Sequence, residues 1–257
     1  ALVELFTGAE CPPCAGADAA CDALAAAFQH GEAILLQYHL HIPARDPLAN
    51  PDAIARSEYY DLEGVPAAFF NGGETISGGS SMWKSDGLYR EYRRRVEAQL
   101  RGKNSAAVEL NVERAANTLS IVSSAKTVMN PASSPSSASD AKGEPKLRLR
   151  LALTEQLVRY AGGNGVRLNH HVVRDFPGGL EGQELVDGRA KVELALELDD
   201  VRRDLNDYRE KQAVFWALVC PSPIPSVELK HLTIIAFVQD DTTKQVLHAV
   251  QVRMPED

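Results

Sequence analysis

Two cysteines separated by two prolines constrain the fold of this chain more than any other feature of its sequence. Cys11-Pro12-Pro13-Cys14 follows an apolar segment at 2–7 and precedes an alanine-rich stretch. Alanine is the best helix former, and proline is favoured in the first turn of a helix. The pattern therefore predicts a short buried strand, then the cysteine pair, then a helix.

A cysteine at a helix N-terminus has the surroundings of a reactive thiol. Cys11 falls at the predicted start of the helix, where partial positive charge and free N–H groups favour a thiolate. Cys14 lies about one turn further on, close enough to form a disulfide with Cys11. We therefore expect a redox-active CxxC pair, in which Cys11 is the nucleophile and Cys14 the resolving thiol. The alternative is a scaffold used only for binding, in which the cysteines do no chemistry.

The residues beside Cys11 predict the direction of its chemistry. Neither Pro12 nor Pro13 has an N–H group to stabilise a thiolate, and Glu10 adjoins Cys11 on the other side. No Lys, Arg or His lies nearby in the sequence. These features predict a mild dithiol that acts as a reductant or isomerase rather than a strong oxidant. We also expect Pro12 and Pro13 to contact the substrate.

The first 104 residues alternate between strand and helix patterns. After the first helix the sequence predicts strands at 33–39, 67–71 and 75–77, and helices at 51–61 and 81–101. Gly72-Gly73 predicts a tight turn between the third and fourth strands. The predicted order is strand, helix, strand, helix, strand, strand, helix. Gly102-Lys103-Asn104 ends the last helix, and we expect a domain boundary there, between 1–104 and 105–257.

The second half of the chain shows the alternation of strands with one buried face. Apolar and polar residues alternate at 108–112, 147–151 and 192–198, and a turn at 240–243 separates two apolar strands. We expect an all-β domain at 105–257, an immunoglobulin-like sandwich. The Ser-, Pro- and Ala-rich segment at 130–146 is expected to be a disordered loop.

Charge and cysteine usage exclude several classes of function. The formal net charge is -8 in 257 residues, which argues against nucleic acid or an anionic membrane as partner. No apolar run reaches the roughly 18 residues of a membrane-spanning helix. The four cysteines do not have the spacing of a zinc site. Cys21 and Cys220 are expected to be buried structural residues, although Cys21 could exchange partners with Cys14.

Residues 1–104 resemble the thioredoxin superfamily. The resemblance rests on the CxxC motif and on Gly64-Val65-Pro66, which matches the segment whose proline is cis in that family. It implies that Pro66 lies against the disulfide and that the Val65 backbone pairs with substrate. Many members place a buried acid six residues before the first cysteine, where this chain has Leu5. Glu4 is the nearest carboxylate, and it could relay protons only if the intervening turn were one residue longer.

A second resemblance covers both halves of the chain. The segments at 4–8, 169–174, 236–240 and 244–247 are similar to bacterial outer-membrane-associated lipoproteins that join a thioredoxin-like domain to a β-sandwich. This resemblance implies a location in the periplasm or cell envelope. We expect the export signal, and with it any lipid anchor, to have been removed from this chain.

Together these features predict a thiol–disulfide oxidoreductase that acts on protein disulfides outside the cytoplasm. Such an enzyme needs no metal or organic cofactor, but it needs an upstream electron donor. The alternative is a non-catalytic binding or envelope-scaffold protein built on a thioredoxin fold. A peroxidase is less favoured, because both cysteines lie in one CxxC motif and no Thr or Arg for binding peroxide is evident before Cys11.

Overall fold

The first half of the chain has the predicted order of elements. The computed structural model describes residues 1–128, 144–216, 224 and 226–254. Most of the predicted loop at 130–146, and Cys220, lie outside these residues. The elements of the first half are β1 (Leu2–Thr7), α1 (Cys14–Ala27), β2 (Ile34–His39), α2 (Pro51–Tyr59), β3 (Ala67–Phe70), β4 (Glu74–Ser77), the 3-10 helix η1 (Met82–Lys84) and α3 (Ser85–Leu100).

The second half is not all-β, so that prediction is wrong. The strands are β5 (Ala106–Ala115), β6 (Thr118–Thr127), β7 (Leu147–Arg159), β8 (Leu168–Asp175), β9 (Gln183–Glu184), β10 (Arg189–Glu197), β11 (Leu232–Asp240) and β12 (Val246–Arg253), with helix α4 (Leu198–Trp216) after β10. The alternation of β10 ends at Leu198. Beyond it the buried residues Leu198, Val201 and Leu205 recur at helical spacing, and two aspartates stabilise the first turn of α4.

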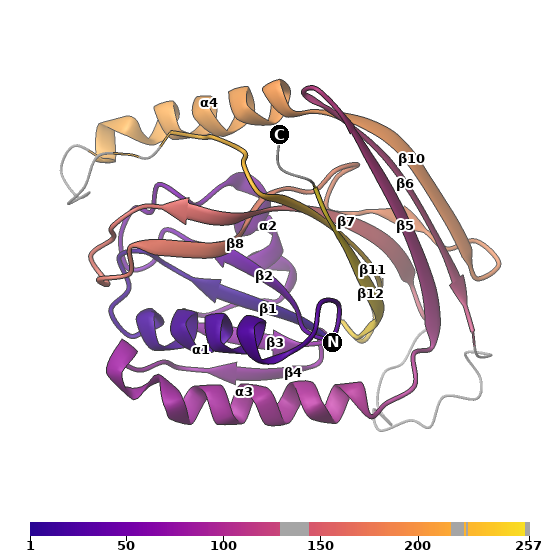
Figure 1. Ribbon diagram of the computed structural model, residues 1–257, viewed down its shortest axis with the longest axis horizontal. Coiled ribbons are helices and arrows are strands. Elements are labelled where there is room, and N and C mark those ends of the chain that lie inside the picture. The colour runs from indigo at the N-terminus through magenta and orange to yellow at the C-terminus, as the bar shows by residue number, and fades with distance from the viewer. Residues whose placement is uncertain (129–143, 217–223, 225, 255–257) are drawn as a thin grey trace.

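One large sheet takes strands from both sides of residue 104. Its order is β12-β11-β7-β8-β2-β1-β3-β4, with β9 also paired to β7. The two halves meet where β2 and β8 pair in parallel, at Gln37 and Val172. Figure 1 shows this sheet running through the middle of the molecule. The fold is therefore mixed α/β, with a sheet continuous across the predicted boundary.

Helices cover both faces of the first strands. Successive side chains of a strand point to opposite faces, and β1 is buried on both. Val3 and Leu5 pack with α1 and α3, which lie side by side. Leu2 and Phe6 pack on the other face, which α2 covers. Residues next to each other in β1 therefore lie in different cores, and this decides which of them can reach the cysteines.

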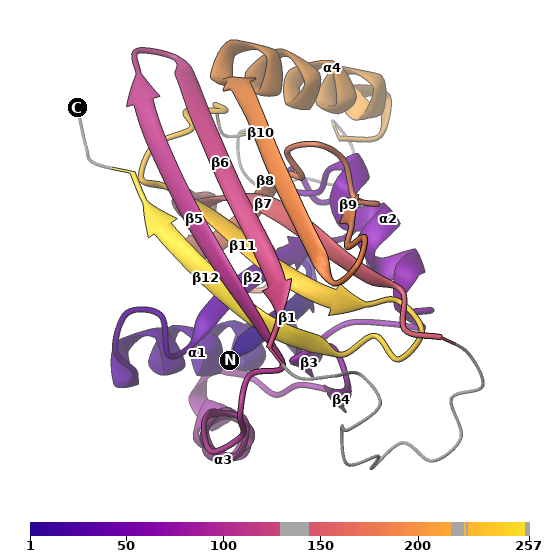
Figure 2. The same ribbon diagram turned by 90° about the vertical axis from the view of Figure 1, so that its right-hand side faces the viewer.

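A second, three-stranded sheet packs on the far end of the large one. Its order is β10-β6-β5, and Figure 2 shows it in front of β11 and β12. Leu119 and Ile121 of β6 share one core with Leu151 of β7 and Ile234 of β11. The neighbouring Ile235 faces the core beneath α2. β11 is thus buried on both faces, which explains its almost continuous apolar sequence.

Candidate functional site

Cys11 and Cys14 form a disulfide at the start of α1. The sulfurs are 2.10 Å apart and the Cα atoms 5.3 Å apart. Helix α1 begins at Cys14, so Cys11 lies in the turn before the helix rather than in its first turn. The amide of Cys11 donates to Gly8 O at 3.1 Å, and that of Cys14 donates to Cys11 O at 3.0 Å. Cys11 is only 2% exposed, so little of its surface is open to an approaching thiol.

The segment before Pro66 lies against this disulfide. The Val65–Pro66 peptide bond is cis, and Cys11 Sγ is 4.0 Å from Val65 O. Pro66 is buried and Val65 is half-buried, whereas Pro12 and Pro13 are exposed. The structure thus brings Val65 and Pro66 to the cysteines and places the two intervening prolines at the surface.

A loop after β4 packs against both parts of the site. Gly16, in the first turn of α1, donates its N–H to Ser80 O at 2.9 Å, and Gly78 donates to Pro66 O at 2.9 Å. A Cβ atom on Gly79 would lie 2.0 Å from Pro13 O and 2.6 Å from Pro66 Cγ. Only glycine allows so close an approach, so this loop holds the CxxC turn and the cis-proline segment together.

Replacing Gly79 with alanine is therefore expected to open the site. The added methyl group must displace the loop, and overpacking of this kind typically costs about 1–3 kcal/mol. We expect lower stability and faster reduction of the Cys11–Cys14 disulfide by dithiothreitol. Gly87→Ala is the matched control, because a Cβ atom there meets nothing within 4 Å. Equal reduction rates in the two variants would contradict the conclusion that this loop holds the CxxC turn and the cis-proline segment together.

Glu4 is not brought to the disulfide. Its side chain lies on the α2 face of β1, whereas α1 packs on the opposite face. Arg56 Nε and Nη2 donate to its carboxylate at 2.8 and 3.0 Å, Tyr38 OH at 2.9 Å and Tyr60 OH at 2.6 Å. Burial, together with the adjoining Glu4 charge, raises the pKa of Tyr38 and Tyr60, so both remain hydrogen-bond donors.

Asp18, which the sequence reasoning missed, is a buried carboxyl on the α1 face of the sheet, the face opposite that of Glu4. It lies four residues after Cys14 on α1, and side chains at this spacing are neighbours on a helix. Thr7 Oγ1 donates to Asp18 Oδ1 at 2.7 Å, while Oδ2 is buried with no hydrogen-bond partner among the described residues. Burial raises the pKa of Asp18 to about 7. The available sequence signal was an acid within the alanine-rich stretch, where Asp18 is one of two, with Asp22.

A buried His–Asp pair adjoins Asp18. His39 is in register with Thr7, so both side chains project from the same face of the sheet. His39 Nδ1 is 2.8 Å from Asp46 Oδ2, which also accepts from Ala9 N at 2.6 Å. Burial opposes the charge of Asp46, but His39 and the backbone amides outweigh it and hold the pKa of Asp46 below its ordinary value. The pair thus anchors the turn before Cys11.

The remaining sequence candidates do not form a second site. Cys21 is a buried free thiol, and burial raises its pKa, which favours the structural interpretation. No group of three His, Cys, Asp or Glu side chains in the described parts of the chain could hold a metal ion. Among the described helices, none is both long and apolar enough to cross a membrane.

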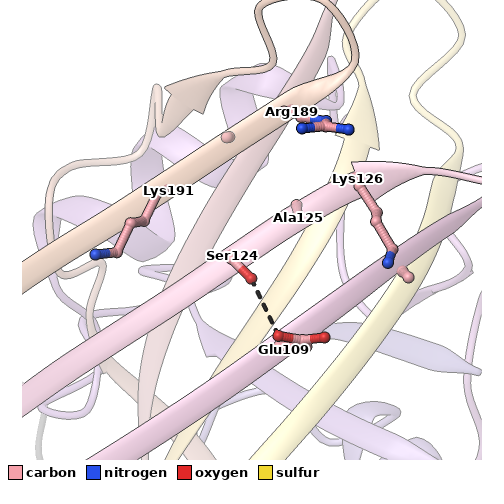
Figure 3. A pocket seen from close by; sticks show the side chains of 8 residues that line it. Glu109, Ser124, Ala125, Lys126, Arg189 and Lys191 are labelled. Atoms are coloured by element: carbon pink, nitrogen blue, oxygen red, sulfur yellow. Dashed lines mark hydrogen bonds between the residues drawn. The ribbon is translucent and has the colours of Figure 1, made fainter.

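Two surface hollows of similar volume differ in their relation to the disulfide. One of about 510 Å³ lies on the outer face of the three-stranded sheet, away from the cysteines. Figure 3 shows that the side chains of Lys126, Arg189 and Lys191 do not converge on one point there. Ser124 Oγ donates to Glu109 Oε2 at 3.4 Å. The other, of about 520 Å³, adjoins the site, since Val65 and Pro66 line it.

Two solved structures share the fold. HBP35 of Porphyromonas gingivalis is similar with a TM-score of 0.63 and 16% identity, over 98% of this chain and 74% of that protein. A structural-genomics protein of Agrobacterium tumefaciens is similar with a TM-score of 0.52 and 16% identity, over 98% and 92% of the two chains. No protein-family model and no curated protein matches the chain. At such identity the likeness concerns fold alone.

Proposed function

We propose that this protein is a thioredoxin-like thiol–disulfide oxidoreductase that reduces or isomerises protein disulfides outside the cytoplasm. The observation that carries the proposal is the Cys11–Cys14 disulfide at the start of α1, with the cis Val65–Pro66 bond beside Cys11. In this proposal residues 1–104 supply the thioredoxin-like unit, and residues 105–257 are an accessory part that extends its sheet and adds a second sheet and α4. The envelope location rests on the resemblance of segments such as 169–174.

The reaction is a sequence of two thiolate attacks. A donor dithiol first reduces the Cys11–Cys14 disulfide, supplying two electrons and two protons. The Cys11 thiolate then attacks a substrate disulfide, forming a mixed disulfide and releasing one substrate thiolate, which takes up a proton. The Cys14 thiolate attacks Cys11 Sγ, releases the second substrate thiol and restores the intramolecular disulfide. Electrons thus pass from the donor dithiol to the substrate disulfide.

Asp18 is the proposed proton acceptor for Cys14. A general base is most effective when its pKa is near the working pH, and burial raises the pKa of Asp18 to about 7. Its unpartnered Oδ2 leaves one lone pair available for the Cys14 proton. When Cys14 attacks Cys11, Asp18 takes the thiol proton, and it returns that proton when the disulfide is next reduced.

Replacing Asp18 with asparagine is expected to slow turnover at pH 7 to 8 by about a hundredfold, the lower end of the usual contribution of a general base. The inflection near pH 7 in the rate profile should disappear. Unlike turnover, the free energy of unfolding at this pH should increase in the variant. The folded pKa is raised above 3.8, so the ionised form is disfavoured by folding, and wild-type stability falls as pH rises from about 4 through 7. The asparagine side chain cannot ionise, so this dependence should be flatter in the variant.

Rate profiles and denaturant unfolding at pH 5 to 9 test this prediction. Asp86→Asn is the control, because that carboxylate is exposed on α3. If Asp18→Asn kept the wild-type profile in both measurements, Asp18 would not be the proton acceptor.

The surroundings of the disulfide favour a protein substrate. Trp83 in η1 is 93% exposed and Met82 is 39% exposed, and the loop before them contacts Gly16 through Ser80. Tryptophan is among the side chains most enriched at the centres of protein interfaces. Exposed Trp83 and the two surface prolines are apolar groups that a polypeptide substrate would contact.

A reduction potential tests the proposed function against the binding-scaffold alternative. The pair is equilibrated in glutathione or dithiothreitol buffers, and the dithiol fraction is measured by mass spectrometry after alkylation. A reducing exchange enzyme should have a potential near about -270 mV, whereas structural disulfides lie below about -300 mV and strong oxidants near -120 mV. A value well below about -300 mV would indicate a structural disulfide and would contradict the proposal.

A further inference from the structure

The loop between β7 and β8 packs on the residues that precede Cys11. Asn164 donates its backbone N–H to Ala9 O at 3.0 Å and its side-chain amide to Gly8 O at 3.2 Å. A Cβ atom on Gly162 would lie 2.2 Å from Ala9 O. The turn before the nucleophile is therefore fixed by residues far along the chain, in its second half.

The same loop holds the carboxylate of Glu10. Tyr160 OH donates to Oε1 at 3.0 Å, and the Gly163 amide donates to Oε2 at 3.0 Å. A Cβ atom on Gly163 would lie 2.4 Å from Oε2, so the loop approaches Glu10 as closely as glycine permits. Tyr160 is itself buried in a small apolar cluster with Val158. Each carboxylate oxygen of Glu10 thus accepts a hydrogen bond from the packed β7–β8 loop.

The donors that hold Glu10 are neutral. Across residues 1–128, 144–216, 224 and 226–254, no ion pair to Glu10 is present. Its negative charge is therefore fixed, without a cationic partner, next to Cys11 in the sequence. A like charge nearby disfavours the thiolate form of a cysteine. The other charged groups near this turn, Asp46 with His39 and Asp18, lie beneath it on the α1 face.

We propose that the β7–β8 loop sets the redox poise of the Cys11–Cys14 pair by fixing the carboxylate of Glu10, the residue that precedes Cys11. This inference rests on the proposed function, and it gives the second half of the chain a role in it. The fixed charge destabilises the Cys11 thiolate in the reduced state and so shifts the exchange equilibrium toward the disulfide. Glu10 and Tyr160 are positioning residues, since they act through Cys11.

Three variants of the full chain test the inference. Glu10→Gln removes the charge, Tyr160→Phe removes one donor, and Gly163→Ala displaces the carboxylate from its place on the loop. Each is reduced, and the pH midpoint of Cys11 alkylation is measured, together with the dithiol–disulfide equilibrium with glutathione at pH 8. Glu58→Gln, an exposed acid on α2, is the control. Circular dichroism confirms that each variant is folded.

Glu10→Gln is expected to lower the alkylation midpoint and to shift the equilibrium about three- to tenfold toward the dithiol, as removal of one partly screened charge should. The two loop variants should give smaller shifts in the same direction. No shift in folded Glu10→Gln would overturn the inference. A shift in Glu10→Gln alone would overturn the role of the loop. Both readouts use small thiols, so failure to reduce protein disulfides would contradict the proposed function separately.

Discussion

Arg56→Ala is expected to destabilise the protein by about 3–5 kcal/mol, the usual cost of breaking a buried ion pair by removing one partner. Arg56 and Glu4 are both 0% exposed, and two guanidinium nitrogens donate to the carboxylate. Without Arg56, the Glu4 charge would remain buried with only the Tyr38 and Tyr60 hydroxyls as donors among the described residues. Urea unfolding at pH 7 measures the loss.

Arg56 also joins the two halves of the chain. Its Nη2 donates to Gln239 Oε1 on β11 at 2.8 Å, and the guanidinium lies over the Phe237 ring, 5.5 Å from its centroid. Wild-type unfolding should therefore be a single transition. Arg90→Ala, which breaks an exposed pair with Asp86, is the control and should change little. Where Arg56→Ala does not fold, Arg56→Lys gives a measurable loss, and a stability equal to wild type in either variant would contradict this account.

Cys11→Ser is expected to reduce the rate of insulin disulfide reduction at least about a thousandfold. A serine hydroxyl is not ionised at neutral pH and cannot form the mixed disulfide, because the thiolate is the nucleophile in exchange. Cys21→Ser is the matched control, since that thiol is buried and unpaired, and burial raises its pKa. It should keep nearly full activity after allowance for any loss of stability. Comparable activity in Cys11→Ser and wild type would exclude Cys11 as the nucleophile.

Local sequence signals were sufficient for the elements of the first half. The apolar run before Cys11, the alanine-rich stretch after it and the Gly72-Gly73 turn each depend on neighbouring residues alone. The pairing of β8 with β2 depends on residues far apart in the chain, such as Gln37 and Val172, and no local pattern specifies it. The prediction of a separate all-β domain failed at α4 because the alternation that precedes Leu198 was not followed into the helical spacing beyond it.

The cysteines of the site were predictable, but their electrostatic surroundings were not. Glu4 is near the cysteines in sequence, yet the alternation of β1 directs its side chain to the opposite core. Asp18 lies on the α1 face of the sheet because α1 packs over Thr7. The contact of Tyr160 with Glu10 spans 150 residues and appears only when the whole sheet is assembled.

Trapping of a mixed disulfide tests the central claim most directly. In Cys14→Ala the resolving thiol is absent, so a substrate captured by Cys11 cannot be released by intramolecular attack. The variant is reduced, mixed with a disulfide-containing protein such as insulin, quenched with acid and analysed by non-reducing electrophoresis and mass spectrometry. We predict a covalent adduct through Cys11 that dithiothreitol reverses and that Cys11→Ser lacks. Absence of this adduct in a folded Cys14→Ala variant would contradict thiol–disulfide exchange as the function of the protein.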